Sequence, residues 1–180
     1  PGQEIRFVTE TPSEPLWHLM AYARDGAGAL EWDQAPELDQ RLLDQIQNDP
    51  AAFRLQPVRI PISRLQGGRV SVAGENPARM ERYMQGWIGN NTWKGAIQFH
   101  SPVLHSDFVI GEFVHGRGFF LHNIAFESAG AGLCVAPVFV LESIERFVPE
   151  TSATLGNIGM VVAGVGALLV LTFLLLARLD

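Results

Sequence analysis

Residues 155–177 (LGNIGMVVAGVGALLVLTFLLLA) form an unbroken run of 23 residues without a charged side chain. A helix rises about 1.5 Å per residue, so a run of this length covers the ~30 Å hydrocarbon core of a bilayer. A signal peptide would lie at the N-terminus, and a helix buried in a larger partner is the remaining alternative. The run predicts a single transmembrane helix that anchors residues 1–154 to a membrane.

The residues around this run predict its orientation and its contacts. Arg178 follows it directly, and positive charge is retained on the cytoplasmic side, so residues 178–180 are predicted to form a cytoplasmic stub. The preceding domain is then expected on the non-cytoplasmic side, in the cell envelope. Gly159, Ala163 and Ala167 recur every four residues, a spacing that permits close helix–helix contact. The chain begins at Pro1, and the sequence leaves open whether a signal or a further span precedes it.

The charge of the chain is negative and unevenly distributed. The formal net charge is −6, and residues 1–53 carry ten carboxylates against three arginines. An acidic chain does not attract phosphate backbones over long range, which argues against nucleic acid as the principal ligand. Cys134 is the single cysteine and cannot form an internal disulfide; its apolar surroundings predict a buried small hydrophobe.

Two helices are predicted before residue 54. In residues 16–24 apolar side chains recur at helical spacing. A second helix is expected to begin with Asp33 as its N-cap and Pro36 in its first turn, and to end at Asn48. Its apolar face consists of Leu38, Leu42, Leu43 and Ile46. Asp49-Pro50 then suits a short additional turn.

The following residues predict an antiparallel sheet. Val58, Ile60 and Ile62 alternate with more polar residues, Gln66-Gly67-Gly68 suggests a turn, and residues 70–72 resume the alternation. Residues 81–100 fit either a helix or a hairpin, and the turn residues at 89–92 favour the hairpin. Residues 107–127 and 134–147 predict further strands, with glycines that allow sharp bends. Five to six bent strands indicate a small, partly open β-barrel.

A resemblance supports this architecture. The succession of WHLMAYARD, an acidic helix, DPAAFR, GRGFFLHNIAFES and APVFVLESIERF resembles a group of uncharacterised bacterial membrane-anchored proteins. The resemblance covers residues 14–148 and implies an OB-like barrel (oligonucleotide/oligosaccharide-binding) beside a transmembrane helix. The matching residues are structural, and the group supplies no catalytic residues. Such proteins tend to carry a lysine after the paired aromatics, where this chain has Leu121.

The predicted fold class is therefore mainly β with N-terminal helices. Residues 1–53 are expected to pack as an acidic segment on an OB-like barrel of residues 54–148. A linker of residues 149–154 then leads to the transmembrane helix and the stub.

No pattern typical of a catalytic or metal site is present. The five histidines have no metal-ligand spacing, and the nucleophile motif of hydrolases is missing. Gly-Arg-Gly at 116–118 is not followed by the helix that a phosphate loop needs. The sequence therefore predicts no catalytic residue, no metal and no cofactor.

Arginines and aromatic side chains are the candidate ligand-binding groups. The arginines fall on the first predicted strands, which contribute to the usual ligand face of such a barrel. The alternative is that they pair with the acidic segment, and for the aromatics that they pack in the core. The candidates are Arg59, Arg64, Arg69, Arg82, Trp87 and Trp93.

The sequence thus favours a membrane-anchored, non-enzymatic binding or scaffold module with a protein partner in the envelope. Binding of single-stranded nucleic acid or glycan through stacking aromatics is the alternative. An enzyme or metal carrier is a third and weaker hypothesis.

Overall fold

The computed structural model describes residues 13–105, 107–128 and 132–149. The predicted transmembrane helix, with Gly159, Ala163 and Ala167, lies outside these residues. Within the described ranges, no helix combines the length and the apolar character needed to cross a membrane. By its internal contacts the chain divides into two units, Pro1–Phe147 and Val148–Asp180.

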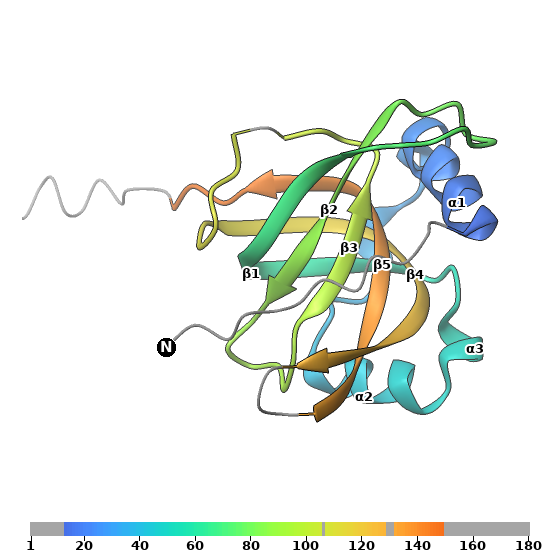
Figure 1. Ribbon diagram of the computed structural model, residues 1–180. Helices are drawn as coiled ribbons and strands as arrows, with labels where there is room; N and C mark the ends of the chain where they lie inside the picture. Colours follow the sequence, from blue (N-terminus) through green and yellow to red (C-terminus); the bar gives the residue numbers. More distant parts are fainter. Residues whose placement is uncertain (1–12, 106, 129–131, 150–180) are drawn as a thin grey trace, which may run out of the picture. The chain divides into compact units, whose positions relative to one another are not determined.

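The described strands form one closed β-barrel (Figure 1). They are β1 (Pro57–Val72), β2 (Arg82–Gly89), β3 (Ile97–Ser101), β4 (Phe113–Ser128) and β5 (Gly132–Arg146). Their order around the barrel is β1-β2-β3-β5-β4. β3 and β5 are parallel, and the other neighbouring strands of the described barrel pair antiparallel. The chain is therefore mainly β with few helices, as predicted, although its sheet is closed where the sequence predicts a partly open barrel.

β1 explains the closure. The turn predicted at Gln66-Gly67-Gly68 is wrong, because β1 runs through it as one strand of 16 residues. The register shifts between Leu65 and Gly67 and again between Ile60 and Ser63. Bulges of this kind bend a strand and increase its twist. The first half of β1 consequently pairs with β4 and the second half with β2, which brings the two edges of the sheet together.

The hairpin at residues 81–100 is confirmed. β2 and β3 pair antiparallel from Met84↔Ser101 to Ile88↔Ile97. Asn90 stabilises the connection, because its side-chain oxygen accepts from the Thr92 backbone N–H at 3.0 Å. This is the local side-chain contact that makes asparagine frequent in turns.

The helices precede the barrel in the chain. They are α1 (Glu14–Asp25), α2 (Gln40–Asn48) and α3 (Pro50–Phe53). Two short 3₁₀ turns, η1 (Ala27–Ala29) and η2 (Trp32–Gln34), lie between α1 and α2. The first helix and the short turn at Pro50 are confirmed, and the Asp49 carboxylate caps α3 through the Ala52 N–H.

The predicted start of the second helix is wrong. Asp33 lies in η2, and the N-cap of α2 is Asp39, whose carboxylate accepts from the Leu42 N–H at 2.7 Å. The backbone before Asp39 pairs with β1 instead: Leu38 N–H donates to the Arg59 carbonyl, and Arg59 N–H donates to the Pro36 carbonyl. These two bonds hold residues 36–38 extended, so a helix cannot begin there.

Two apolar clusters hold the helices against the barrel. Inside the barrel, Phe99, Phe120 and Phe139 are fully buried together with Leu38 and Ile46 from the segment before β1. On the outside, α1 packs Trp17, Leu19 and Met20 against side chains of β2, β4 and β5. The acidic segment is thus part of the same unit as the barrel, and packing of apolar side chains attaches it. Cys134 is half-buried rather than buried.

β4 and β5 approach each other closely at Gly118. A Cβ atom at this position would lie 2.2 Å from the Val140 carbonyl oxygen and 2.7 Å from the Leu141 Cα. Both contacts are with backbone, which cannot rotate away, so Gly118→Ala is expected to lower the free energy of unfolding by about 1–3 kcal/mol. Urea denaturation measures this loss. Gly74→Ala, where a Cβ meets nothing within 4 Å, is the matched control. An equal stability of the two variants would contradict the tight approach.

Candidate functional site

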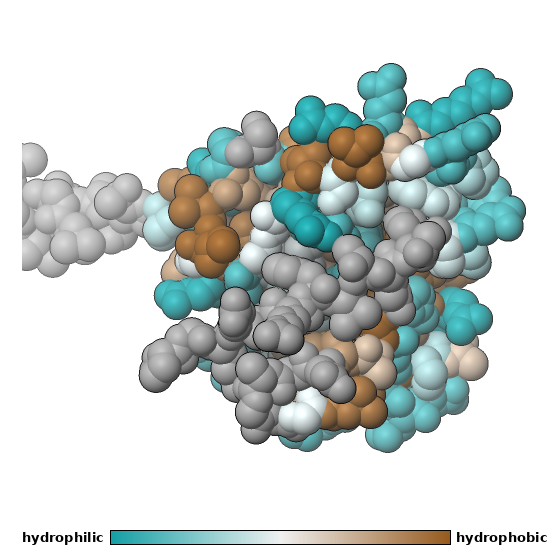
Figure 2. All heavy atoms as spheres, viewed as in Figure 1, coloured by the Kyte–Doolittle hydropathy of each residue, from teal (hydrophilic) through white to brown (hydrophobic). Residues whose placement is uncertain are grey.

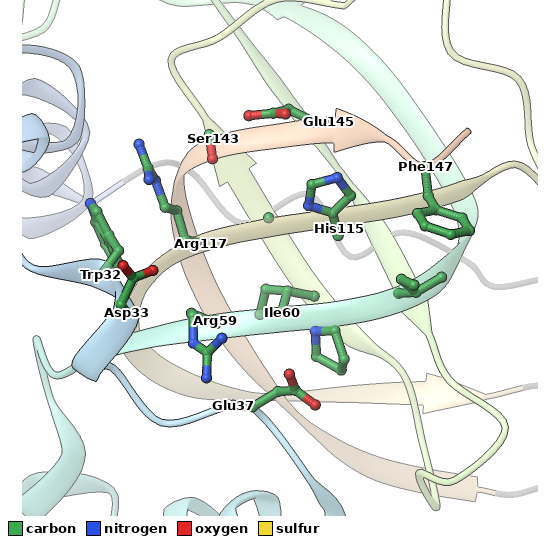
Figure 3. A pocket seen from close by; sticks show the side chains of 13 residues that line it. Trp32, Asp33, Glu37, Arg59, Ile60, His115, Arg117, Ser143, Glu145 and Phe147 are labelled. Atoms are coloured by element: carbon green, nitrogen blue, oxygen red, sulfur yellow. The ribbon is translucent and has the colours of Figure 1, made fainter. Parts of the chain in front are cut away.

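Three neighbouring strands build a polar cleft on the outer face of the barrel (Figure 3). Arg59 of β1, Arg117 of β4 and Ser143 of β5 are successive register partners, and His115 and Glu145 form a second pair across β4 and β5. Register partners point to the same face of a sheet, so these side chains stand side by side. The cleft has a volume of about 400 Å³ and also includes Pro61, Ile62 and Phe147.

The segment before α2 forms one wall of this cleft. Trp32 and Asp33 lie at one end and Phe147 at the other (Figure 3). Arg59 fastens the wall to β1, because its guanidinium Nε donates to the Ala35 carbonyl at 2.9 Å. Glu37 forms a parallel bridge with Arg59 through the backbone. Both contacts reach the main chain of the wall rather than its acidic side chains, and the carboxylates of Asp33 and Glu37 stay exposed.

Arg117 is neutralised within the protein. Its Nε donates to Glu142 Oε2 at 2.6 Å and its Nη2 to Oε1 at 3.3 Å, a two-point contact. The guanidinium carbon lies 5.2 Å from the Trp32 ring centre. The hydrogen bond to Glu142 is the main reason why the pKa of Arg117 is raised, and the nearby charges of Glu145 and Asp33 add to it.

A bulge makes this ion pair possible. The register passes from Arg117↔Ser143 to Gly118↔Leu141, which leaves Glu142 as the extra residue of β5. A bulge redirects the side chain of the extra residue. Glu142 can thus reach Arg117 while Ser143 keeps its place in the row of outward side chains.

The cleft carries a net negative charge. Asp33, Glu37 and Glu145 line it and are exposed, whereas Arg117 is already paired with Glu142. Arg59 is the remaining positive side chain of the lining. Three carboxylates around one arginine favour a ligand that brings positive charge, and the apolar surface of Pro61, Ile62 and Phe147 adds a place for an aliphatic group.

The predicted arginines do not form one face. Arg59 lies in the cleft and contacts the acidic segment through a carbonyl rather than a carboxylate. Arg64 lies over the Phe113 ring at 5.4 Å. Arg69 and Arg82 are exposed on the part of the β1–β2 pair that lies beyond the cleft lining.

The predicted aromatic side chains are buried. Trp87 is 2% exposed and packs against Phe126, with ring centres 5.1 Å apart. Trp93 is 8% exposed and belongs to the barrel core. Stacking on a base or a sugar requires an open ring face. Neither tryptophan presents one in this arrangement.

Several residues of the cleft were not predicted. Arg117 and Glu142 are 25 positions apart in the sequence, and only the bulge in β5 brings them together. The one local signal is the alternation of His115 and Arg117 with glycines, which marks outward positions on a close-packed strand. Trp32 and Asp33 carry no such signal, because their place depends on the pairing of residues 36–38 with β1.

A second hollow lies beside α1. It has a volume of about 590 Å³ and is lined mostly by apolar side chains, including Leu19, Tyr22, Leu55 and Phe119. His18, Arg54 and the hydroxyl of Tyr22 are the polar groups of its lining. Specific sites combine apolar surface with converging polar groups, which the cleft of β1, β4 and β5 offers in larger number.

His100 is a buried titratable group outside the cleft. It is 8% exposed, and its ring centre lies 5.9 Å from that of Tyr83. Burial, with a smaller contribution from the charge of His122, lowers the pKa of His100 from 6.5 to about 4. The neutral imidazole is therefore the form that the fold accommodates.

This shift predicts a pH dependence of stability. Below pH 6.5 the unfolded chain binds a proton at His100 that the folded chain does not bind until about pH 4. Stability is thus expected to fall as the pH is lowered through this window, by up to about 3 kcal/mol, since one pKa unit corresponds to about 1.4 kcal/mol. Urea denaturation between pH 4 and pH 7 measures the slope. His100→Gln should flatten it, whereas the exposed His18→Gln should not; identical slopes for the two variants would contradict the assignment.

The described residues contain no group of three or more histidine, cysteine, aspartate or glutamate side chains suited to a metal ion. No protein-family model and no curated protein matches the chain. Fold and site therefore define the class on their own: a small closed β-barrel with N-terminal helices and an acidic outer cleft.

Proposed function

We propose that the chain is a membrane-anchored, non-enzymatic binding module that holds a basic, extended segment of a partner protein in the cleft of β1, β4 and β5. The observation that carries the proposal is the set of exposed carboxylates at Asp33, Glu37 and Glu145 around a cleft in which Glu142 already neutralises one of the two arginines, Arg117. Lysine or arginine side chains of a partner are the complementary groups. The apolar end of the cleft, at Pro61, Ile62 and Phe147, suits an aliphatic side chain that lies between the basic residues of the partner segment.

We also infer that the barrel is OB-like. The strand order β1-β2-β3-β5-β4 and the parallel pairing of β3 with β5 support an OB-like barrel. OB barrels are known for ligand binding on the face of their second and third strands. Here the cleft is on another face, so the use of the barrel for oligonucleotides or oligosaccharides gains no support from the cleft. Its negative charge also disfavours phosphate-bearing ligands.

Anchoring by residues 155–177 supplies the membrane part of the proposal. The full chain is expected to stay in the membrane pellet after a carbonate wash, because a helix formed by these 23 uncharged and mostly apolar residues would insert stably. A chain that ends at Pro149 is expected in the supernatant. Release of the full chain by carbonate would contradict the anchor.

Binding to peptides tests the partner. The full chain, reconstituted in lipid nanodiscs, is titrated into three labelled ten-residue peptides, and their fluorescence anisotropy is followed. One peptide alternates lysine and valine, one glutamate and valine, and one glycine and serine. We expect saturable binding of the lysine peptide only, and weakening of that binding as salt is raised, because the attraction is electrostatic.

A single-stranded DNA oligomer serves as the competing ligand in the same assay. Saturable binding of the oligomer, without binding of the lysine peptide, would overturn the protein-partner proposal in favour of nucleic acid. Equal binding of all three peptides would show that the cleft does not select by charge, and would also contradict the proposal.

A further inference from the structure

The turn that precedes β4 exposes apolar side chains where turns usually carry polar ones. Glu112 N–H donates to the Val109 carbonyl at 3.2 Å, which closes a four-residue turn, and Gly111 has the positive φ of 97° that its third position requires. Val109 is 61% exposed and Ile110 is 70% exposed. Phe113, at the start of β4, is 48% exposed. We call Val109, Ile110 and Phe113 the apolar tip.

Hydrogen bonds from three directions fix the apolar tip. Gly111 N–H donates to the Leu65 carbonyl at 2.7 Å, and Leu65 N–H donates to the Glu112 carbonyl at 2.9 Å. The Val109 N–H donates to the Glu112 carboxylate at 3.1 Å. The same carboxylate accepts from Arg146 Nε, also at 3.1 Å. The tip is therefore presented rigidly, which lowers the entropic cost of inserting it into another phase.

The C-terminal end of β5 lies beside the apolar tip. Arg146 is the last residue of β5 and contacts Glu112 and Asp107 on either side of the turn. Phe147 N–H donates to the Phe113 carbonyl at 2.8 Å. The chain thus leaves the barrel beside the apolar tip. Figure 2 shows hydrophobic side chains gathered at this end of the barrel, at the left of the view.

The distance along the chain to the predicted anchor is short. Seven residues, and so eight Cα-to-Cα steps, separate Phe147 from Leu155. Even fully extended they span at most about 29 Å, at 3.3–3.6 Å per residue. An anchored chain therefore keeps this end of the barrel close to the bilayer surface. The charged side chains around the tip balance: Arg64 and Arg146 are positive, and Asp107 and Glu112 are negative. The tip therefore has no net charge to attract charged lipids, and insertion of its apolar side chains is the contact that it can make with a bilayer.

We propose that the apolar tip inserts into the interfacial region of the bilayer that holds the chain's own anchor, and thereby fixes the orientation of the barrel on the membrane. The inference rests on the proposed anchor at residues 155–177. Exposed, contiguous apolar residues mark contact surfaces, and here the lipid surface is the partner that the tether keeps within reach. The cleft of β1, β4 and β5 would then hold a defined direction relative to the membrane.

A nitroxide label at the tip tests the contact. The full chain carries Cys134→Ser to remove the native thiol and Ile110→Cys to take the label, and it is reconstituted in neutral phosphatidylcholine vesicles. Power-saturation EPR compares the accessibility of the label to oxygen, which enters the bilayer, and to a water-soluble nickel chelate. The control is a label at Val72→Cys, because Val72 is 82% exposed and lies at the far end of β1.

We expect the ratio of oxygen to nickel accessibility to be at least about threefold higher at position 110 than at position 72, as insertion by 5–10 Å requires. Val109→Asp, which places a charge beside the label, should lower the ratio at position 110 to the value of the control. A carbonate wash of the same vesicles reports the anchor separately.

The possible outcomes are distinct. Loss of the chain from the vesicles in carbonate overturns the anchor and the tip contact together. A retained chain whose label at 110 is as open to nickel as the label at 72 overturns the tip contact alone. Protection at 110 that disappears when the labelled chain is diluted with unlabelled lipid indicates contact between two copies, and also overturns the contact with lipid.

Discussion

Ile46→Ala is expected to lower the free energy of unfolding by about 2–5 kcal/mol, the usual range for removing a buried isoleucine side chain. Ile46 is fully buried and belongs to the cluster that fills the barrel, although it comes from α2. The loss therefore measures how strongly the acidic segment is attached. Chemical denaturation of the full chain, followed by near-UV circular dichroism of the barrel tryptophans, provides the measurement.

Two controls separate packing from charge. Gln47→Ala changes the neighbouring exposed residue of the same helix and should leave stability within about 0.5 kcal/mol. Arg64→Gln removes one of the arginines of β1, and an exposed charge is worth only about 0–1 kcal/mol. If Arg64→Gln were as damaging as Ile46→Ala, attachment by packing would be refuted.

Phe120→Ala is expected to be at least as damaging, at about 3–5 kcal/mol. Phe120 is fully buried, and its ring meets that of Phe139 edge to face with centres 5.7 Å apart. Truncation leaves a cavity in the middle of a closed barrel, where the surrounding strands are hydrogen-bonded on both sides and cannot collapse into it. Thermal and urea unfolding measure the loss.

Phe113→Ala provides the matched control on the same strand. Phe113 is 48% exposed, so its truncation should cost no more than about 1 kcal/mol. Similar losses for the two phenylalanines would mean that the inside and outside of β4 are assigned wrongly.

Local sequence patterns predicted much of this fold. Alternation located β1, and the turn residues at Gly89 and Asn90 distinguished the hairpin of β2 and β3 from a helix. The glycine pair at 67–68 predicts a turn where β1 has a bulge, because both turns and bulges favour glycine. What distinguishes them is β2: a Cβ atom at Gly86 would lie 2.2 Å from the Gly67 carbonyl oxygen, a long-range contact that no local pattern contains.

The candidate site was less accessible to prediction. The sequence predicts Arg59 only as one of several arginines on the first strands, whereas its place in the cleft depends on the backbone of residues 36–38. Trp87 and Trp93 are predicted as stacking surfaces because an indole ring can stack on a base, whereas strand register buries both side chains. Glu142 reaches Arg117 through a bulge. In each case the missing information is a pairing between distant segments.

The charge preference of the cleft tests the central proposal most directly. Glu37→Lys combined with Glu145→Lys reverses two of its three exposed carboxylates, and Glu75→Lys combined with Glu81→Lys makes the same change on the β1–β2 connection, away from the cleft. The measured quantity is the ratio of the Kd values for the lysine–valine and glutamate–valine peptides, with each full-length chain in lipid nanodiscs.

For the natural chain and for the control we expect the lysine peptide to bind more tightly by about tenfold, which corresponds to about 1.4 kcal/mol. For the cleft variant we expect the preference to be lost or inverted. An unchanged preference in the cleft variant, or an equal loss in the control, would contradict binding of a basic segment in this cleft.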